Sequence, residues 1–510
     1  MVNAGRGRWW RTAVVGTVAL LVLAGFVGWY QLLREVPQPD FPDEETRFKY
    51  GSLGAESDRG IPYWVWVVLP RVFPDLLPGQ GGYASLGLTW EPGQEMPVGF
   101  AKKTVGFPRV TNNCAVCHTA RYRVREDAPP AFVTGGPAHT SDIQNNIRFL
   151  TRCAEDPRFE SRILLDEISR VYGLSWIERP LYRFLVIPFT RRALLRQKEQ
   201  FAWMDRPGKP HWLPGRDDPM NLTKYFMTGM PEDDTTGQAD FPSIWNLKVR
   251  KGPDLLLNWS GDTPAVRSVI IDSALGLGAP PGQPFLRRME EIDTFLSNRP
   301  PPPWPAELPV DRTQAAAGAP VYREHCASCH DVGAPYTNKV IPLAELGTDP
   351  ERERTWTAEA AARANQAVKD MGIDRPPMIK SPPGYVSPPL DGVWLRAPYL
   401  HNGSVPNMRA LLLPPAARPR YFFRGNDVID AAALGFVSET CARAPARDDT
   451  GRDTLGPDGT CAASDLACRP QAPCVRHDTT LRGNGNGGHA YGTDLPEAQK
   501  AALVEFLKTL

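Results

Sequence analysis

The longest uncharged hydrophobic stretch of the chain lies near its N-terminus, over residues 12–33. A helix needs about 20 apolar residues to cross a bilayer, so this stretch is long enough. Arg6, Arg8 and Arg11 precede it, and the positive-inside rule therefore places the N-terminus in the cytoplasm. A cleaved signal peptide is the alternative, but no small-x-small cleavage site follows before Gln31. We expect an uncleaved membrane anchor over residues 1–35.

Behind this anchor, apolar residues recur at helical spacing in separate stretches. Three of them are residues 141–153, 160–171 and 191–203. In residues 284–298 one helical face is apolar and consists of Phe285, Met289, Ile292, Phe295 and Leu296. The proline-rich run 300–305 must end that helix and form a semi-rigid spacer. The chain is therefore expected to divide into a first domain, 36–300, and a second domain, 301–510.

The second domain is predicted to open and close with a helix. An alanine-rich stretch begins at Asp311 and runs to Cys326. The closing stretch, 496–510, carries an apolar stripe of Leu503, Phe506, Leu507 and Leu510. A closing amphipathic helix packed across an opening one outlines a small α-helical domain, and we expect the helix ending at Asn298 to close the first domain in the same way.

Composition adds long loops to this picture. The chain has 53 prolines and 44 glycines in 510 residues, which favours ordered loops between short helices. Its net charge is +1 without a long charge run, so nothing indicates nucleic acid as a partner.

Two Cys-x-x-Cys-His motifs supply the candidate chemistry. The first is Cys114, Cys117 and His118; the second is Cys326, Cys329 and His330. This spacing is typical of covalent haem c attachment, in which both thiols form thioethers and the adjacent histidine binds the iron. A redox Cys-x-x-Cys pair or half of a zinc site is the alternative. Two copies that both end in histidine, in an exported chain, favour haem.

The predicted fold is therefore mainly α, with two cytochrome c-like haem domains, long Pro/Gly-rich loops and one N-terminal transmembrane helix. Haem c is attached outside the cytoplasmic membrane, which agrees with a single-pass inner-membrane protein whose bulk lies in the periplasm. Five cysteines remain outside the motifs: Cys153, Cys441, Cys461, Cys468 and Cys474. An oxidising compartment favours one or two disulfides among them and leaves an odd thiol.

The chain resembles the di-haem cytochrome c peroxidase superfamily, which includes the enzyme that matures methylamine dehydrogenase and the di-haem rubber oxygenases. The segment 385–406, which contains Pro-Tyr-Leu-His-Asn-Gly-Ser-Val-Pro, carries the superfamily resemblance. Shorter segments are most similar to the rubber-oxygenase branch: 214–218, 241–245, 258–262, 274–278 and 488–492. Together these patches extend over residues 80 to 510.

The second axial ligand decides whether a haem moves electrons or binds oxygen species. For the second haem, the candidates are Met378, His401 and His489. His489 follows a glycine-rich loop that can approach a porphyrin, and the resemblance implies that it is the distal ligand. His401 is implied to orient groups around the haem without binding iron. For the first haem, His139 is the only distal histidine candidate, and the resemblance implies an open site.

The resemblance also implies an aromatic side chain that carries an electron between the haems. Trp245 is the first candidate for this bridge, followed by Trp259 and Tyr225. Arg216 and Arg396 lie in similar segments and are candidates for pairing with haem propionates through bidentate hydrogen bonds.

Two functions agree with these expectations. The first is a redox enzyme of the peroxidase or oxygenase type, with peroxide or dioxygen at an open first haem and a six-coordinate second haem. The alternative is a membrane-anchored cytochrome that only transfers electrons. Either function requires a small redox protein as electron donor or acceptor.

Overall fold

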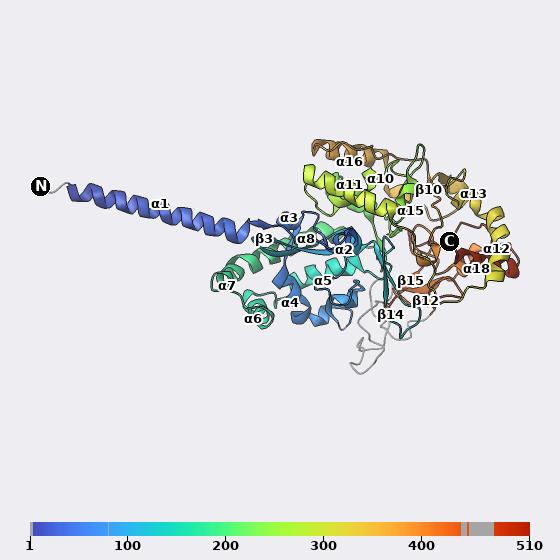
Figure 1. Cartoon of the computed structure of the whole chain (residues 1–510), viewed down its shortest axis with the longest axis horizontal. Helices are drawn as coiled ribbons and strands as arrows, with labels where there is room; N and C mark the ends of the chain where they lie inside the picture. Colours follow the sequence, from blue (N-terminus) through green and yellow to red (C-terminus); the bar gives the residue numbers. More distant parts are fainter. Residues whose placement is uncertain (1–3, 80, 440–445, 448–473) are drawn as a thin grey trace.

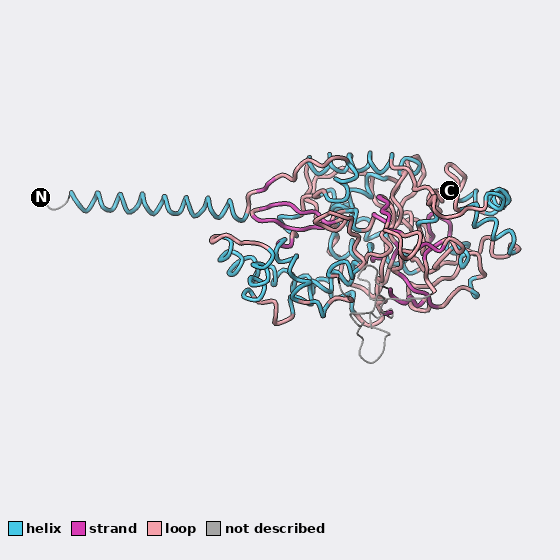
Figure 2. Tube along the Cα trace, turned by 60° about the horizontal axis from the view of Figure 1, so that its bottom comes forward, coloured by secondary structure: helices cyan, strands magenta, loops and turns pink. Residues whose placement is uncertain are grey.

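We describe the protein from a computed structural model, which covers residues 4–79, 81–439, 446–447 and 474–510. A long helix, α1 (Ala4–Leu32), projects from a body that holds the rest of the described chain (Figures 1 and 2). Within the described residues, one segment, Ala13–Leu32, is helical, long and apolar enough to cross a membrane. The predicted N-terminal apolar helix is therefore present.

The helices of the first half surround the larger hydrophobic core. They are α2 (Glu44–Tyr50), α3 (Glu56–Arg59), α4 (Tyr63–Val72), α5 (Ile143–Glu155), α6 (Ser161–Val171), α7 (Glu178–Leu181), α8 (Ile187–Phe201), α9 (Pro219–Leu222), α10 (Val266–Gly276) and α11 (Gln283–Asn298). Short 3-10 or π turns are η1 (Pro74–Leu76), η2 (Gly82–Leu86), η3 (Cys114–Val116), η4 (Tyr182–Val186), η5 (Ala202–Asp205), η6 (Thr223–Met227) and η7 (Leu247–Arg250). The four predicted helical stretches are confirmed by α5, α6, α8 and α11.

The second half is built around the pair α12 and α18. Its helices are α12 (Arg312–His325), α13 (Ala327–His330), α14 (Leu343–Leu346), α15 (Glu351–Thr355), α16 (Ala358–Asp370), α17 (Met408–Leu411) and α18 (Glu497–Leu507), with turns η8 (Val393–Leu395) and η9 (Pro415–Ala417). Asp311 caps α12 by accepting hydrogen bonds from the backbone of Thr313 and Gln314. The predicted opening and closing helices of this half are confirmed.

The strands are short and form small sheets. They are β1 (Glu35–Val36), β2 (Ile61–Pro62), β3 (Phe100–Val105), β4 (Phe107–Asn112), β5 (Thr119–Tyr122), β6 (Ala131–Thr134), β7 (Arg216–Asp217), β8 (Ala239–Asp240), β9 (Val340–Pro342), β10 (Gly384–Val386), β11 (Tyr421–Arg424), β12 (Ile429–Asp430), β13 (Gly435–Phe436), β14 (Ala446–Arg447) and β15 (Cys474–Asp478). The largest described sheet has the order β1-β3-β4-β2 and is antiparallel throughout. Its hairpin β3–β4 turns at Gly106, where φ is +71° and glycine is favoured.

The first motif lies in a different setting from the one expected. No opening helix leads into it: the hairpin β3–β4 does, and the motif begins in η3. The side chain of Asn113 caps this turn and also donates to the carbonyl oxygens of Lys49 and Gly51 at the end of α2. Helix α2 packs against both η3 and α11. A hairpin thus leads into the first motif where a helix leads into the second, so the expectation that the first domain is built in the same way as the second was wrong in this respect.

The predicted disulfides lie mostly outside the described residues, because Cys441, Cys461 and Cys468 are not described. Cys474 is disulfide-bonded. Cys153 is a buried free thiol in the first core.

Gly318 lets α12 and α18 approach each other closely, and its replacement should be costly. A Cβ atom at Gly318 would lie 2.1 Å from the carbonyl oxygen of Ala502 in α18. Because backbone must move to relieve this contact, we expect Gly318→Ala to lower the free energy of unfolding by about 3 kcal/mol. Gly276 in α10 is the matched control, since a Cβ there meets nothing within 4 Å. Denaturant titration of both variants should show a neutral or slightly stabilising Gly276→Ala, and equal effects would contradict this packing.

Candidate functional site

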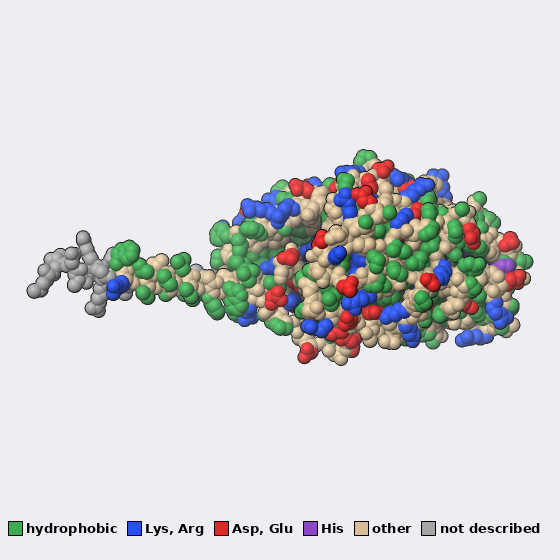
Figure 3. Space-filling model, turned by 90° about the horizontal axis from the view of Figure 1, so that it is seen from above, with side chains coloured by type: hydrophobic (Ala, Val, Ile, Leu, Met, Phe, Trp, Pro, Cys, Tyr) green, Lys and Arg blue, Asp and Glu red, His purple; other side chains and the backbone are tan. Residues whose placement is uncertain are grey.

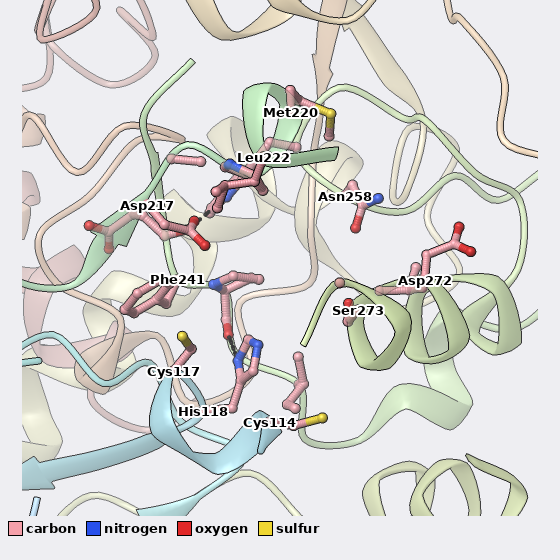
Figure 4. A pocket seen from close by; sticks show the side chains of 18 of the residues that line it. Cys114, Cys117, His118, Asp217, Met220, Leu222, Phe241, Asn258, Asp272 and Ser273 are labelled. Atoms are coloured by element: carbon pink, nitrogen blue, oxygen red, sulfur yellow. Dashed lines mark hydrogen bonds between the residues drawn. The ribbon is translucent and has the colours of Figure 1, made fainter. Parts of the chain in front are cut away.

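The first motif places a neutral histidine at the wall of a cavity. His118 follows η3, and its Nδ1 hydrogen-bonds the carbonyl oxygen of Pro242 at 3.0 Å (Figure 4). This partner keeps the proton on Nδ1 and leaves Nε2 available to a metal. Burial lowers the pKa of His118 to about 4, so the imidazole is uncharged at neutral pH. Cys114 and Cys117 lie on either side of it in Figure 4.

The second motif repeats this arrangement at the end of α12. Its histidine, His330, directs Nδ1 at the carbonyl oxygen of Pro388, 2.7 Å away. Burial lowers its pKa as well. In both motifs, then, a proline carbonyl more than fifty residues downstream fixes the tautomer. Both prolines lie in segments that carry the family resemblance, but nothing else in the sequence marks them as partners of the motif histidines.

A single continuous cavity of about 1880 Å³ connects the two motifs and is lined by all six motif side chains. Pockets for one small ligand usually enclose about 300–1,000 Å³, so this space suits more than one large group. None of the four motif cysteines is paired in a disulfide. Among the described residues, no group of three or more His, Cys, Asp and Glu side chains is arranged to hold a metal ion. This donor set fits haem c and does not support the zinc alternative.

His489 faces the second motif histidine. The ring centroids of His330 and His489 are 6.3 Å apart. A metal bound by both imidazoles lies about 2 Å from each ligating nitrogen. When the distance from each nitrogen to its ring centre is added, the two ring centres are about 6 Å apart, as observed here. Burial lowers the pKa of His489 to about 4, which keeps its imidazole neutral as a ligand requires. The pair can therefore hold a metal between them.

The backbone around His489 is held in an unusual conformation. Its φ angle is +45°, which is uncommon for a residue other than glycine. Arg418 donates hydrogen bonds to the carbonyl oxygens of Gly488 and His489, and a Cβ at Gly488 would lie 2.3 Å from the backbone of Gly347. The glycine-rich loop is thus pressed against the α14 region, and this contact aims the histidine ring at the cavity.

The other proposed distal ligands lie on the cavity wall without facing His330. Met378 belongs to a small apolar cluster with Met220 and Trp356. His401 stacks on the ring of Tyr385 with centroids 3.8 Å apart, and burial together with Arg352 and Arg216 holds its pKa well below the usual range. Two expectations remain predictions. Met378 is the alternative ligand of the second haem iron, and His401 orients groups around that haem without binding iron.

The first motif histidine has a different ring neighbour. Among the described residues, the ring beside His118 is that of Phe241, at 6.5 Å between centroids, next to the Pro242 that holds Nδ1, and phenylalanine cannot bind iron. Figure 4 shows Asp217, Leu222 and Met220 across the pocket from His118. His139 does not line the cavity; it stacks on Phe436 with centroids 3.8 Å apart.

The candidate bridging aromatics occupy three different places. Trp245 is buried and donates to the carbonyl oxygen of Asp391, and it lies behind the cavity wall. Trp259 lines the cavity and donates to Asp240. Tyr225 packs on Trp203 outside the cavity. The bridging role of Trp245 stays a prediction, and Trp259 is the candidate with direct access to the cavity.

The candidate propionate partners also differ. Arg216 is buried outside the cavity lining, where it donates to the carbonyl oxygen of Asn402 and to Asn484 Oδ1. Arg396 lines the cavity and pairs with Asp391 at 2.7 Å. The cavity wall holds further arginines that the sequence did not single out, among them Arg250 and Arg352. Burial lowers the pKa of Arg250 to about 10, a cost that an acidic group in the cavity would offset.

Asp217 should make stability depend on pH. Burial and the neighbouring Asp218 raise its pKa from 3.8 to about 7, so the folded protein keeps a proton that the unfolded chain releases. The free energy of unfolding should therefore fall as pH rises from about 4 to about 7 and stay level above that range. In Asp217→Asn, thermal unfolding between pH 5 and pH 8 should show a smaller decline than in the unaltered protein. An identical decline in both would contradict this assignment.

Comparisons with known proteins agree with a cytochrome. Residues 384–423, which include His401, match the family described as RoxA-like, cytochrome c-like. A cytochrome c-like domain related to the di-haem rubber-oxygenase branch is therefore present in this segment, and the match supports haem c binding.

Two proteins of Sinorhizobium fredii are similar over longer stretches. Uncharacterized protein y4iM is 31% identical over 226 residues, which cover 39% of this chain and 49% of that protein. Uncharacterized protein y4iJ is 26% identical over 540 residues, which cover 84% of this chain and 81% of that protein. The chain thus spans about half the length of the first relative and most of the second.

Proposed function

We propose that the chain is a membrane-anchored periplasmic di-haem cytochrome c that acts as a redox enzyme of the peroxidase or oxygenase type. The single observation that carries this proposal is the continuous cavity between the two motifs, with unlike surroundings at its two ends. At one end the rings of His330 and His489 lie 6.3 Å apart, and at the other the ring contact of His118 among the described residues is with Phe241, which cannot bind iron. When bound, haem c supplies an iron that transfers electrons and, where an axial position is open, binds dioxygen or peroxide.

Different residues would attach, bind and surround the two haem groups. Cys114, Cys117, Cys326 and Cys329 would attach the two groups covalently. Pro242 and Pro388 hold the motif histidines as neutral ligands through their Nδ1 atoms. His489 closes the second site, and its loop is fixed by Arg418. Positive charge for the haem propionates would come from three arginines on the cavity wall, Arg250, Arg352 and Arg396.

Asp217 adds a proton donor near the first motif. It lines the same cavity as His118, and its raised pKa of about 7 keeps much of it protonated at neutral pH. A general acid with a pKa near the working pH is suited to proton transfer. We therefore propose that Asp217 delivers protons while peroxide or dioxygen is reduced at the first site.

Turnover assays test this proposal. The full-length protein in detergent should oxidise a reduced small cytochrome c with hydrogen peroxide, or consume dioxygen with an organic substrate. Asp217→Asn should slow turnover at pH 7 by about a hundredfold, the lower end of the range that general acids contribute. A protein that only exchanges electrons, without consuming either oxidant, would instead be an electron-transfer cytochrome.

The location rests on the N-terminal helix. α1 is long and apolar enough to span the membrane once, with Arg6, Arg8 and Arg11 on its N-terminal side. We expect the mature protein to keep residues 1–33 and to stay in the membrane fraction after carbonate washing. Intact-mass measurement decides this point, because a product that begins after residue 30 would show a cleaved signal peptide.

A further inference from the structure

The C-terminal end of α1 is fixed to the body. Arg109 donates to the carbonyl oxygen of Leu32 at 3.3 Å, and the Gly106 N–H donates to the carbonyl oxygen of Arg34 at 2.8 Å. Strand β1 follows at once and pairs with β3. If α1 crosses a bilayer, these contacts hold the body in a fixed position relative to the membrane surface.

Aromatic residues mark the level of the membrane surface on α1. Trp29 and Tyr30 are 49% and 42% exposed at its C-terminal end, and Arg34 lies over the Tyr30 ring at 4.3 Å. Tryptophan, tyrosine and arginine at the end of a spanning helix are typical of the membrane–water interface. The interface should thus lie close to the base of α1, where the body begins.

The body carries exposed aromatic rings at the same end. Helices α7 and α8 lie beside the base of α1 (Figure 1), and Figure 3 shows hydrophobic side chains gathered where α1 joins the body. Trp176, Phe184 and Phe189 are 84%, 70% and 55% exposed. Large apolar side chains exposed together mark an interaction site.

Arginines surround these rings. Residues 176–196 contain five arginines and one glutamate. Arg183 lies over the Phe184 ring at 5.3 Å, and Arg192 lies over the Phe189 ring at 5.6 Å. Aromatic side chains flanked by arginine are the composition of helices that lie in the surface of an anionic membrane. We call Trp176, Phe184, Phe189 and the arginines of 176–196 the α7–α8 surface.

The cavity of the first motif opens at this surface. Its wall includes Leu32 at the base of α1, Phe107 of the hairpin, and Leu185 and Phe189 of the α7–α8 surface. The same wall continues to His118. An apolar molecule entering beside Phe189 would thus reach the first motif along a continuous lined path.

We propose that the α7–α8 surface lies on the lipid bilayer that α1 crosses, and that the cavity takes up a lipid-dissolved apolar molecule there. The bilayer supplies the apolar partner that the exposed rings lack, and its anionic headgroups pair with the arginines. The inference rests on α1 as an uncleaved anchor, and it does not depend on which oxidant the enzyme uses.

A depth measurement tests the docking. The full-length protein is placed in nanodiscs of phosphatidylglycerol and phosphatidylethanolamine, with Phe184→Cys carrying an environment-sensitive fluorophore. Tyr421→Cys on β11 is the matched control, since Tyr421 is an aromatic residue that is 42% exposed. The label at position 184 should emit at shorter wavelength and be quenched by nitroxide lipids, whereas the label at 421 should not. Equal exposure of both labels to water would overturn the proposal.

Cross-linking tests the entry path. A long-chain alkyl diazirine dissolved in the nanodisc should, after illumination, modify Leu185, Phe189 and Leu222, which all line the cavity. Phe189→Arg should reduce labelling of Leu222 at least fivefold while labelling of α1 is unchanged. Modification confined to α1 would overturn the proposal, and so would a mature protein that lacks α1. Because this readout does not require turnover, an inactive protein with the expected labelling would contradict only the proposed enzyme.

Discussion

Replacing His489 by alanine should convert the second haem from low-spin to high-spin and open it to carbon monoxide. His489 lies 6.3 Å from His330 between ring centroids, and its loop is fixed by Arg418. Removing the imidazole would take away the side chain that we propose as the distal ligand of the second haem. Electron paramagnetic resonance of the resting protein should lose its low-spin signal, while the haem content stays at two.

His401→Ala is the matched control for this variant. His401 also lines the cavity, but it stacks on Tyr385, so its loss should leave the low-spin signal intact and slow turnover by disturbing the pocket. A lost signal in His401→Ala with an unchanged His489→Ala would mean that the two roles are exchanged. A lost signal only in Met378→Ala would make the second site an ordinary histidine–methionine cytochrome.

Replacing Cys114 and Cys117 by serine should halve the covalently bound haem. Each motif attaches one group through two thioethers, so acid–acetone extraction should leave one haem per chain in place of two. Turnover should be lost entirely, because we propose the first site as the open one. Cys153→Ser is the control, since Cys153 is a free buried thiol that belongs to neither motif and does not line the cavity. An unchanged haem content in the double variant would contradict attachment at this motif.

Local sequence patterns predicted the helices that carry strong periodicity. α11 and α18 have apolar stripes that need a partner, and α12 leads directly into the second motif. The setting of the first motif was not predictable in this way. Its turn depends on Asn113 reaching the end of α2, more than sixty residues earlier in the chain, and such a long-range contact leaves no periodic signal.

The sequence predicted the residues of the candidate site that belong to short, recognisable motifs. The six motif residues and His489 were found from spacing and resemblance, and the structure brings them to one cavity. Pro242 and Pro388 act through backbone carbonyls, which every residue has. Arg250 and Arg352 are candidates for binding an acidic group only because folding places them on the cavity wall. Arg216 is the same residue type, but it lies outside the cavity and donates to the carbonyl oxygen of Asn402. Residue type alone cannot separate these cases.

One haem site should be open and the other closed. Titration of the reduced full-length protein with carbon monoxide, followed in the Soret band, tests it most directly. We expect one carbon monoxide molecule per chain in the unaltered protein, with half of the resting haem low-spin. Binding of none, with both haems low-spin, would indicate an electron carrier, and binding of two would contradict the ligation of the second haem by His489.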